Sequence, residues 1–334
     1  MSALSELYPT LLDVKSQFTP DGKVASDIVD ILAPTNECLD DFVFLPTNNK
    51  MSHRTTTLTG MPEPTWRKLY GFTQPQKATF ENITDTCGML EAFSHVDPDL
   101  ADMSGNPRQV RKNQDMVKVK GFNKTVVEAT FYSNEATAPE QITGLSPRFA
   151  DDDSTSENYQ NVIKDSNGTP DTSMWLCVWG PDSGFHLYPE GTNAGLSMTD
   201  DGIITDTNGS GGYRKLYQTH FKWKLGLCIR DWRYFVRIQF DKDQLLKSGA
   251  TQVDLIDLLT QALELPPNLT AGRTAIYANR HTKSFLRRQI ANKVAASTLT
   301  METVAGKHVM MFDGIPVRRC DALLGTENTD APIA

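Results

Sequence analysis

The chain has 334 residues, of which 39% are hydrophobic and 22% charged, and its formal net charge is −8. These values are typical of a globular protein and exclude a disordered chain, which would have fewer apolar residues and more net charge for its length. The acidic balance disfavours a free-standing nucleic-acid-binding domain, and no apolar run approaches the roughly 18 residues that a membrane-spanning helix needs.

The beginning of the chain is predicted to be helical. Apolar residues recur at helical spacing over residues 2–18 and 23–33, with a turn at Thr19–Gly22 between them. These two short helices could form an arm that packs on a neighbouring subunit, or a helical hairpin within one domain, and the sequence leaves both open. Because a basic lead and a long apolar run are missing, we expect no signal peptide.

Residues 45–85 are rich in threonine and proline, and their apolar residues are too sparse to build a core. The threonine and aromatic content favours extended strands. A connection of this length without its own packing is unusual inside a compact domain. We therefore predict a two-stranded arm that reaches onto another subunit, where strand-type recognition would satisfy its backbone and its aromatic side chains together.

A long helix is predicted over residues 107–132, where apolar residues form one stripe on a mostly polar helix. Asn106 followed by Pro107 is typical of a helix start. The helix also carries a basic cluster. Its members are Arg108, Arg111, Lys112, Lys118, Lys120 and Lys124. They could form a solvated helix face, ion pairs with a neighbouring chain, or a non-specific contact with phosphates.

Strands dominate the middle of the chain. Residues 174–179 and 185–188 predict a hairpin, and residues 190–212 predict a flexible loop. The clearest strand signal covers residues 221–240, where the apolar residues move from odd to even positions near Arg230–Asp231. A one-residue slip flips the buried face, so a bulge or turn is expected there.

The last third predicts two helices, over residues 251–268 and 279–296, and a terminal hairpin around Asp313–Gly314. The second helix carries another basic cluster with the same alternatives as the first. It consists of Arg280, Lys283, Arg287, Arg288 and Lys293.

Motifs for catalysis or metal binding are missing. No His-x-x-x-His, Gly-x-Ser-x-Gly or phosphate-binding loop occurs, and the acidic run Asp151–Asp153 is more typical of a solvated loop than of a cation site. Five widely spaced cysteines argue against a disulfide framework, so we expect buried free thiols. We predict no enzyme activity, no cofactor and no metal site.

Several segments, in their order along the chain, resemble known proteins. They are TWRKLYGF at 65–72, the long basic helix, GLCIRDWRYFVRI at 226–238, HTKSFLRRQI at 281–290 and GIPVRR at 314–319. This ordered set resembles the major capsid proteins of short-tailed, podovirus-type bacteriophages, whose fold is shared by tailed phages and herpesviruses. The resemblance covers nearly the whole chain.

The resemblance implies an α+β fold and a division into four parts. These would be an N-terminal arm (1–43), an extended loop (44–86), a peripheral domain (87–139 and 300–334, with a spine helix at 107–132) and a mainly axial domain (140–299, with the 221–240 strands in it or in the peripheral sheet). Such subunits would form hexamers and pentamers of an icosahedral shell around double-stranded DNA.

The resemblance and the residue pattern together assign two sets of site residues, one for a contact with another subunit and one for a contact with DNA. The contact with another subunit is assigned to Trp66, Arg67, Leu69, Tyr70 and Phe72, although these residues could also pack on their own subunit. The DNA-facing patch is assigned to Arg108, Arg111, Lys112, Lys118 and Lys120.

The resemblance also implies partners and a location. The partners would be copies of this chain, cement or decoration proteins, scaffolding and portal proteins, and packaged DNA, without a membrane. The location would be the virion capsid, assembled in the host cytoplasm. The alternative function is a phage tail component or a receptor- or carbohydrate-binding structural protein, for which a β-rich pattern or repeats would be expected throughout.

Overall fold

The computed structural model describes residues 36–103, 105–150, 158–165, 169–207, 212–246, 253–292, 299–304 and 307–327. Both predicted N-terminal helices and the acidic run Asp151–Asp153 lie outside these residues. The described residues divide into two compact units: Leu90–Asn123 and Leu196–Trp223 belong to unit 1, and the rest belongs to unit 2.

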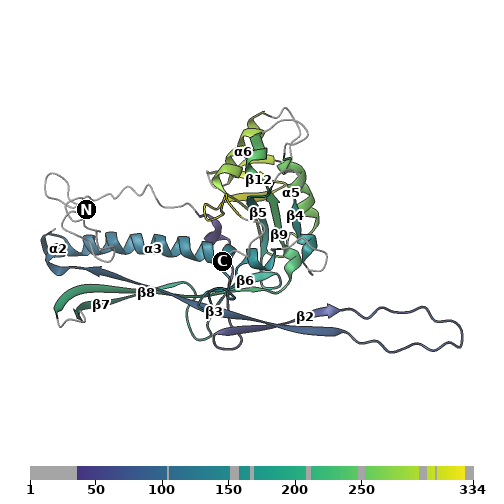
Figure 1. Cartoon of the computed structure of the whole chain (residues 1–334), viewed down its shortest axis with the longest axis horizontal. Coiled ribbons are helices and arrows are strands. Elements are labelled where there is room, and N and C mark those ends of the chain that lie inside the picture. The colour runs from purple at the N-terminus through teal and green to yellow at the C-terminus, as the bar shows by residue number, and fades with distance from the viewer. Residues whose placement is uncertain are drawn as a thin grey trace. The chain divides into compact units, whose positions relative to one another are not determined.

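Unit 2 contains a mixed seven-stranded sheet with the order β11-β12-β13-β10-β5-β9-β4 (Figure 1). Its strands are β4 (Val162–Lys164), β5 (Thr172–Trp179), β9 (Phe235–Phe240), β10 (Arg273–Ala278), β11 (Leu299–Val304), β12 (Lys307–Phe312) and β13 (Ile315–Arg319). Strand β5 pairs antiparallel with β9 and β10, whereas β10 and β13 are parallel. Every residue of β5 and β9 is buried, as expected for central strands covered on both faces.

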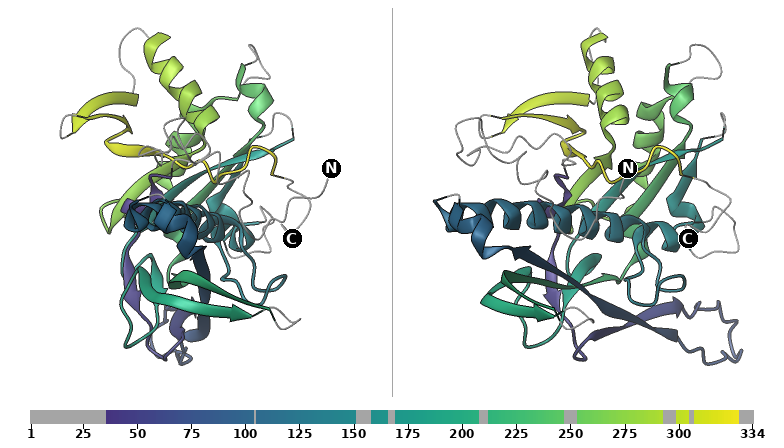
Figure 2. Two further views of the ribbon diagram at one scale, coloured as in Figure 1. Left: turned by 90° about the vertical axis from the view of Figure 1, so that its left-hand side faces the viewer. Right: turned by 60° about the vertical axis from the view of Figure 1, so that its left-hand side comes forward.

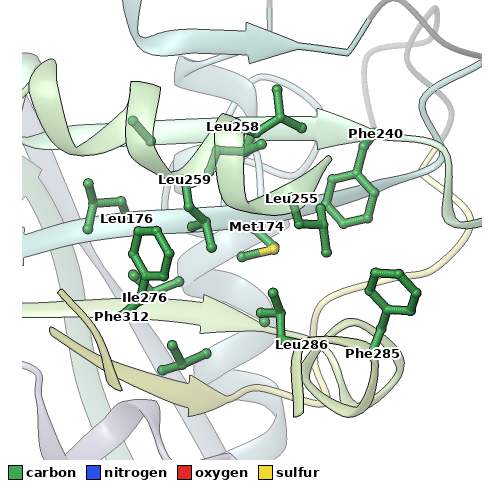
Figure 3. Packing of buried hydrophobic residues seen from close by; sticks show 14 of the residues in the cluster. Met174, Leu176, Phe240, Leu255, Leu258, Leu259, Ile276, Phe285, Leu286 and Phe312 are labelled. Atoms are coloured by element: carbon green, nitrogen blue, oxygen red, sulfur yellow. The ribbon is translucent and has the colours of Figure 1, made fainter. Parts of the chain in front are cut away.

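Two helices close the core of this sheet. Helix α5 (Leu255–Glu264) and helix α6 (Arg280–Asn292) confirm the helices predicted from the sequence, with shorter bounds. The Asp254 carboxylate caps α5 by accepting hydrogen bonds from the Ile256 and Asp257 N–H groups at 3.0 and 3.3 Å. Figure 3 shows the cluster that the helices and the sheet share. Its members include Met174, Leu176, Leu255, Leu258, Leu259, Ile276, Phe285, Leu286 and Phe312.

A second sheet has the strand order β1-β6-β8-β3-β2, and β7 also pairs with β8. Its strands are β1 (Phe44–Pro46), β2 (Ser52–Gly60), β3 (Thr79–Val96), β6 (Gly184–Tyr188), β7 (Leu196–Thr207) and β8 (Tyr213–Ile229). The long strands β3 and β8 contribute residues to both units.

Helix α3 (Pro107–Tyr132) confirms the predicted long helix, and its first part belongs to unit 1 together with the short helix α2 (Pro98–Met103). The Asn106 side chain accepts a hydrogen bond from the Gln109 N–H at 3.3 Å and so caps α3 as expected. Within unit 1, α3 lies along one face of β7 and β8, where the Phe122 and Phe221 ring centroids are 6.2 Å apart (Figure 2).

Two predictions about strands are wrong. Residues 174–179 and 185–188 do form strands, but β5 and β6 belong to different sheets and make no hairpin with each other. Both strands are largely buried, so alternation could not show which sheet each one joins. Part of the predicted loop at 190–212 is strand β7, whose polar threonine and aspartate residues give no apolar signal.

The predicted break near Arg230–Asp231 and the terminal hairpin are both confirmed. Strand β8 ends at Ile229, a short 3₁₀ turn covers Trp232–Tyr234, and β9 then joins the other sheet. Asp313 and Gly314 have φ angles of 49° and 78°, which suits the tight turn between β12 and β13. Strands β12 and β13 share the sheet of β5, β9 and β10; the assignment of segments to peripheral and axial domains stays a prediction.

His186 on β6 is a fully buried histidine. Its Nε2 lies 3.1 Å from the Thr130 Oγ1, and its ring stacks on Phe42 with the centroids 4.2 Å apart. Burial lowers the pKa of His186 to about 3, so the imidazole is neutral in the folded chain.

This histidine should make the fold sensitive to acid. The unfolded chain binds the proton more readily, so the stabilising effect is complete above about pH 6.5 and falls by up to about 1.4 kcal/mol per pH unit as the pH drops toward the folded-state pKa. Urea unfolding of the unassembled subunit between about pH 7 and pH 5 should therefore show a shallower pH dependence for His186→Asn than for the parent chain. His281→Asn, which removes an exposed histidine, is the control. Parallel pH curves for His186→Asn and the parent would contradict the expectation.

Candidate assembly surface

Strands β2 and β3 form a two-stranded antiparallel arm, and the loop 61–78 joins them at its tip (Figure 1). Pairing runs from Ser52↔Thr86 to Gly60↔Thr79, with a register shift between Leu58 and Gly60. All residues of β3 from Thr79 to Thr84 are exposed, so this part of the arm is open to solvent on both faces. An isolated two-stranded ribbon is marginally stable in water, and this one therefore has much to gain from a covering partner.

The tip carries the largest exposed apolar side chains of the arm. Trp66, Tyr70 and Phe72 have relative exposures of 104%, 99% and 101%, and Leu69 is 90% exposed. The Gly71 N–H donates to the Lys68 carbonyl oxygen at 2.9 Å, which closes a turn within the tip. Four large apolar side chains so close together and so exposed are typical of an interaction site.

The structure thus brings the predicted contact residues together. Trp66, Leu69, Tyr70 and Phe72 are fully exposed beside the exposed Arg67, and none of them packs on its own unit. The partner that would cover them stays a prediction. Met61 and Phe80 are also exposed on the same arm, at 79% and 65%, and were not predicted as contact residues. Met61 lies in the loop at the tip and Phe80 in β3, where apolar residues are usually half-buried, so the sequence did not indicate that both would be exposed.

The root of the arm is fixed by an ion pair that no sequence pattern indicates. Asp85 on β3 is buried, and its Oδ1 lies 2.7 Å from Nη2 of Arg148. The Arg148 guanidinium also donates to the carbonyl oxygens of Thr143 and Leu227, both at 3.3 Å. One arginine therefore joins β3, β8 and the segment before helix α4 (Leu145–Arg148) within unit 2.

We expect Arg148→Met to loosen this root. The change leaves the Asp85 carboxylate buried without its cation, and we expect a loss of about 2–3 kcal/mol, less than for a fully buried pair because Arg148 is partly exposed. Amide hydrogen exchange should become faster for residues 83–87 of the unassembled subunit. Arg54→Met, which removes an exposed arginine from β2, is the control. Equal exchange rates in the two variants would show that the ion pair does not fix the arm.

The five residues of the predicted DNA patch do not form one uniform surface. Arg108, Lys112, Lys118 and Lys120 are exposed on α3. Arg111 is half-buried: its Nη2 lies 2.5 Å from Asp200 Oδ1, and its guanidinium sits 4.9 Å from the centre of the Tyr217 ring. This ion pair holds the pKa of Asp200 below its usual value and offsets the charge that Arg111 could offer to a phosphate. The contact with DNA stays a prediction.

The second basic cluster is partly offset by ion pairs within unit 2. Arg280 lies 2.9 Å from Asp321, and Lys283 lies 3.4 Å from Glu37. Burial lowers the pKa of Lys283. Arg287 is exposed, as is its neighbour Arg288, and Lys293 lies outside the described residues.

Among the residues that the structure describes, no group of three His, Cys, Asp or Glu side chains is arranged to hold a metal ion. All five cysteines are free and buried, as predicted, and burial raises the pKa of the Cys38 and Cys177 thiols. Among the helices of the described residues, none combines the length and the hydropathy needed to cross a membrane.

Comparison with solved structures defines the class of protein. Over 98% of its length the chain is similar to 99% of a chain in the structure of bacteriophage epsilon15, with 34% sequence identity and a TM-score of 0.77. A bacteriophage JBD30 capsid chain is also similar, with 10% identity, coverage of 89% of this chain and 94% of that chain, and a TM-score of 0.47. The similarity to the epsilon15 structure confirms the α+β fold of tailed-phage capsid proteins.

The family follows from the sequence. The family model described as major capsid protein GP7 matches residues 19–330, so the chain belongs to that family. No curated protein matches the chain. Membership confirms the resemblance to phage major capsid proteins, gives the chain a structural role in the phage head, and disfavours a tail or receptor-binding protein.

Proposed function

We propose that this capsid protein forms hexamers and pentamers that close into an icosahedral shell around the double-stranded DNA genome. The observation that supports the proposal most directly is the exposed tip of the β2–β3 arm. Trp66, Tyr70 and Phe72 are covered by nothing in their own unit. Burying each of them on a second copy would contribute about 1.5–3 kcal/mol. Repeated at every subunit of a ring, such contacts would favour cooperative assembly.

We further propose a cytoplasmic site of assembly and partners other than copies of this chain. Assembly takes place in the host cytoplasm, and the shell incorporates a portal protein and cement or decoration proteins. A separate scaffolding protein guides closure. The protein performs no catalytic step in this role.

Electron microscopy of the purified full-length protein tests the proposal. Rings of subunits or closed particles are expected once the concentration rises or a crowding agent is added. Analytical ultracentrifugation of the same samples should show the monomer in equilibrium with discrete larger species. A compact monomer at all concentrations, with no ring in any micrograph, would overturn the proposal.

A further inference from the structure

Helix α3 exposes apolar residues on the side that faces away from its sheet. In unit 1 the sheet side of α3 is marked by Val110 and Phe122, which are 5% and 4% exposed. Met116 and Val119 are instead 50% and 42% exposed. An outward side of a helix that simply meets water would be expected to carry polar residues.

The apolar residues on this outward side are flanked by basic ones. At about 100° per residue, five exposed residues of α3 fall within an arc of about 120°. They are Arg108, Lys112, Met116, Val119 and Lys120, and together we call them the α3 stripe. Arg111 lies outside this arc and is paired with Asp200. An apolar centre between cations suits a partner that is both apolar and acidic.

The N-terminal segment of this chain has that chemistry. Residues 1–33 contain five acidic and two basic side chains, for a net charge of −3, whereas α3 contains six basic and two acidic ones, for a net charge of +4. The same segment repeats apolar residues at helical spacing. They are Leu4, Leu7, Leu11 and Val14, followed by Val24, Ile28 and Leu32. The segment is therefore complementary to the α3 stripe in both charge and hydropathy.

The lengths also agree. The two helices predicted for the segment have 17 and 11 residues, which corresponds to about 42 Å of helix at about 1.5 Å per residue. Helix α3 has 26 residues, or about 39 Å on the same basis. The α3 stripe itself, from Arg108 to Lys120, is about 18 Å long on the same basis, so the first of the two predicted helices is long enough to cover it.

We propose that residues 1–33 dock on the α3 stripe, with their leucines on Met116 and Val119 and their carboxylates facing Arg108 and Lys112. Packaged DNA is the competing partner for the same cations. Its phosphates would satisfy the charges but would leave Met116 and Val119 without an apolar cover, so the observations favour the acidic, apolar segment.

Methionine oxidation of the full-length, DNA-free subunit tests the docking. Peroxide oxidises methionines according to their access to solvent, and we expect Met116 to react about tenfold more slowly than Met198 if the stripe is covered. In the described structure these side chains have comparable exposures of 50% and 61%, so the ratio would otherwise be near unity. Leu7→Asp combined with Leu11→Asp should bring the two rates together. Ser5→Asp combined with Ser16→Asp adds the same charge on the opposite side of the predicted helix and should preserve the protection.

Three results would overturn the proposal. The first is equal oxidation of Met116 and Met198 in the parent subunit. The second is protection that survives the Leu7→Asp and Leu11→Asp changes. The third is protection that is absent from DNA-free subunits and appears only in DNA-filled particles, which would assign the α3 stripe to nucleic acid.

Discussion

Replacing Glu327 by glutamine should destabilise the subunit by about 3–5 kcal/mol, because it breaks a fully buried ion pair. The Glu327 side chain is 2% exposed, and its Oε2 lies 2.9 Å from Nη2 of Arg237, which is 4% exposed. The hydroxyls of Tyr132 and Ser173 also donate to this carboxylate. Glutamine keeps the shape but removes the negative charge, so the Arg237 guanidinium stays buried without a counter-charge.

Urea unfolding of the unassembled subunit measures this loss. Glu135→Gln removes the same charge from an exposed position, and its unfolding midpoint should stay near that of the parent chain. Replacing both partners, as Arg237→Met with Glu327→Leu, should recover much of the stability, because no charge is then left buried. If Glu327→Gln and Glu135→Gln unfold at the same urea concentration, the buried pair does not stabilise the fold.

The Glu327 carboxylate connects the last described segment, residues 307–327, to other elements of unit 2. It joins the end of α3 through Tyr132 to β5 and β9 through Ser173 and Arg237. The Leu324 N–H donates to the Tyr132 hydroxyl oxygen at 2.9 Å, which adds a second link to the same helix end. The loss expected for Glu327→Gln is therefore a loss of connections between elements far apart in the sequence.

Elements with strong local signals could be predicted from the sequence. Helix α3 begins at Pro107 as expected, because the Asn106 cap and the proline act within one turn. The Asp313–Gly314 turn is equally local, since both residues adopt positive φ angles that few other pairs accept. The exposed tip of the arm could be predicted for a different reason: residues 61–78 have too few apolar partners to pack on one another.

Features that depend on distant partners could not be predicted. Arg148 and Asp85 are 63 positions apart, and Arg237 and Glu327 are 90 apart, so no spacing rule links them. Strands β5 and β6 follow each other closely, yet they enter different sheets, because burial on both faces removes the alternation that would distinguish them. Strand β7 shows apolar alternation only at Leu196 and Met198, and its pairing with β8 decides its conformation.

The combined change Trp66→Ala and Tyr70→Ala should leave the subunit folded but unable to assemble at the concentrations that suffice for the parent chain. Both side chains are fully exposed in their own unit, so their removal creates no cavity there. If each contributes about 1.5–3 kcal/mol when buried on a second copy, losing both weakens every such contact by about 3–6 kcal/mol, or roughly a hundredfold or more in its equilibrium constant. Light scattering against protein concentration measures the shift in the assembly threshold.

The control must remove an exposed aromatic ring that lies off the arm. Tyr213→Ala suits this purpose, because Tyr213 is 77% exposed on β8. The two variants should share the urea midpoint of the parent, and only the arm variant should need a higher concentration to assemble. Equal assembly thresholds would mean that Trp66 and Tyr70 stay exposed to water in the shell. The energy of the contact would then have to come from the strands of the arm, through residues such as Phe80 and Leu58.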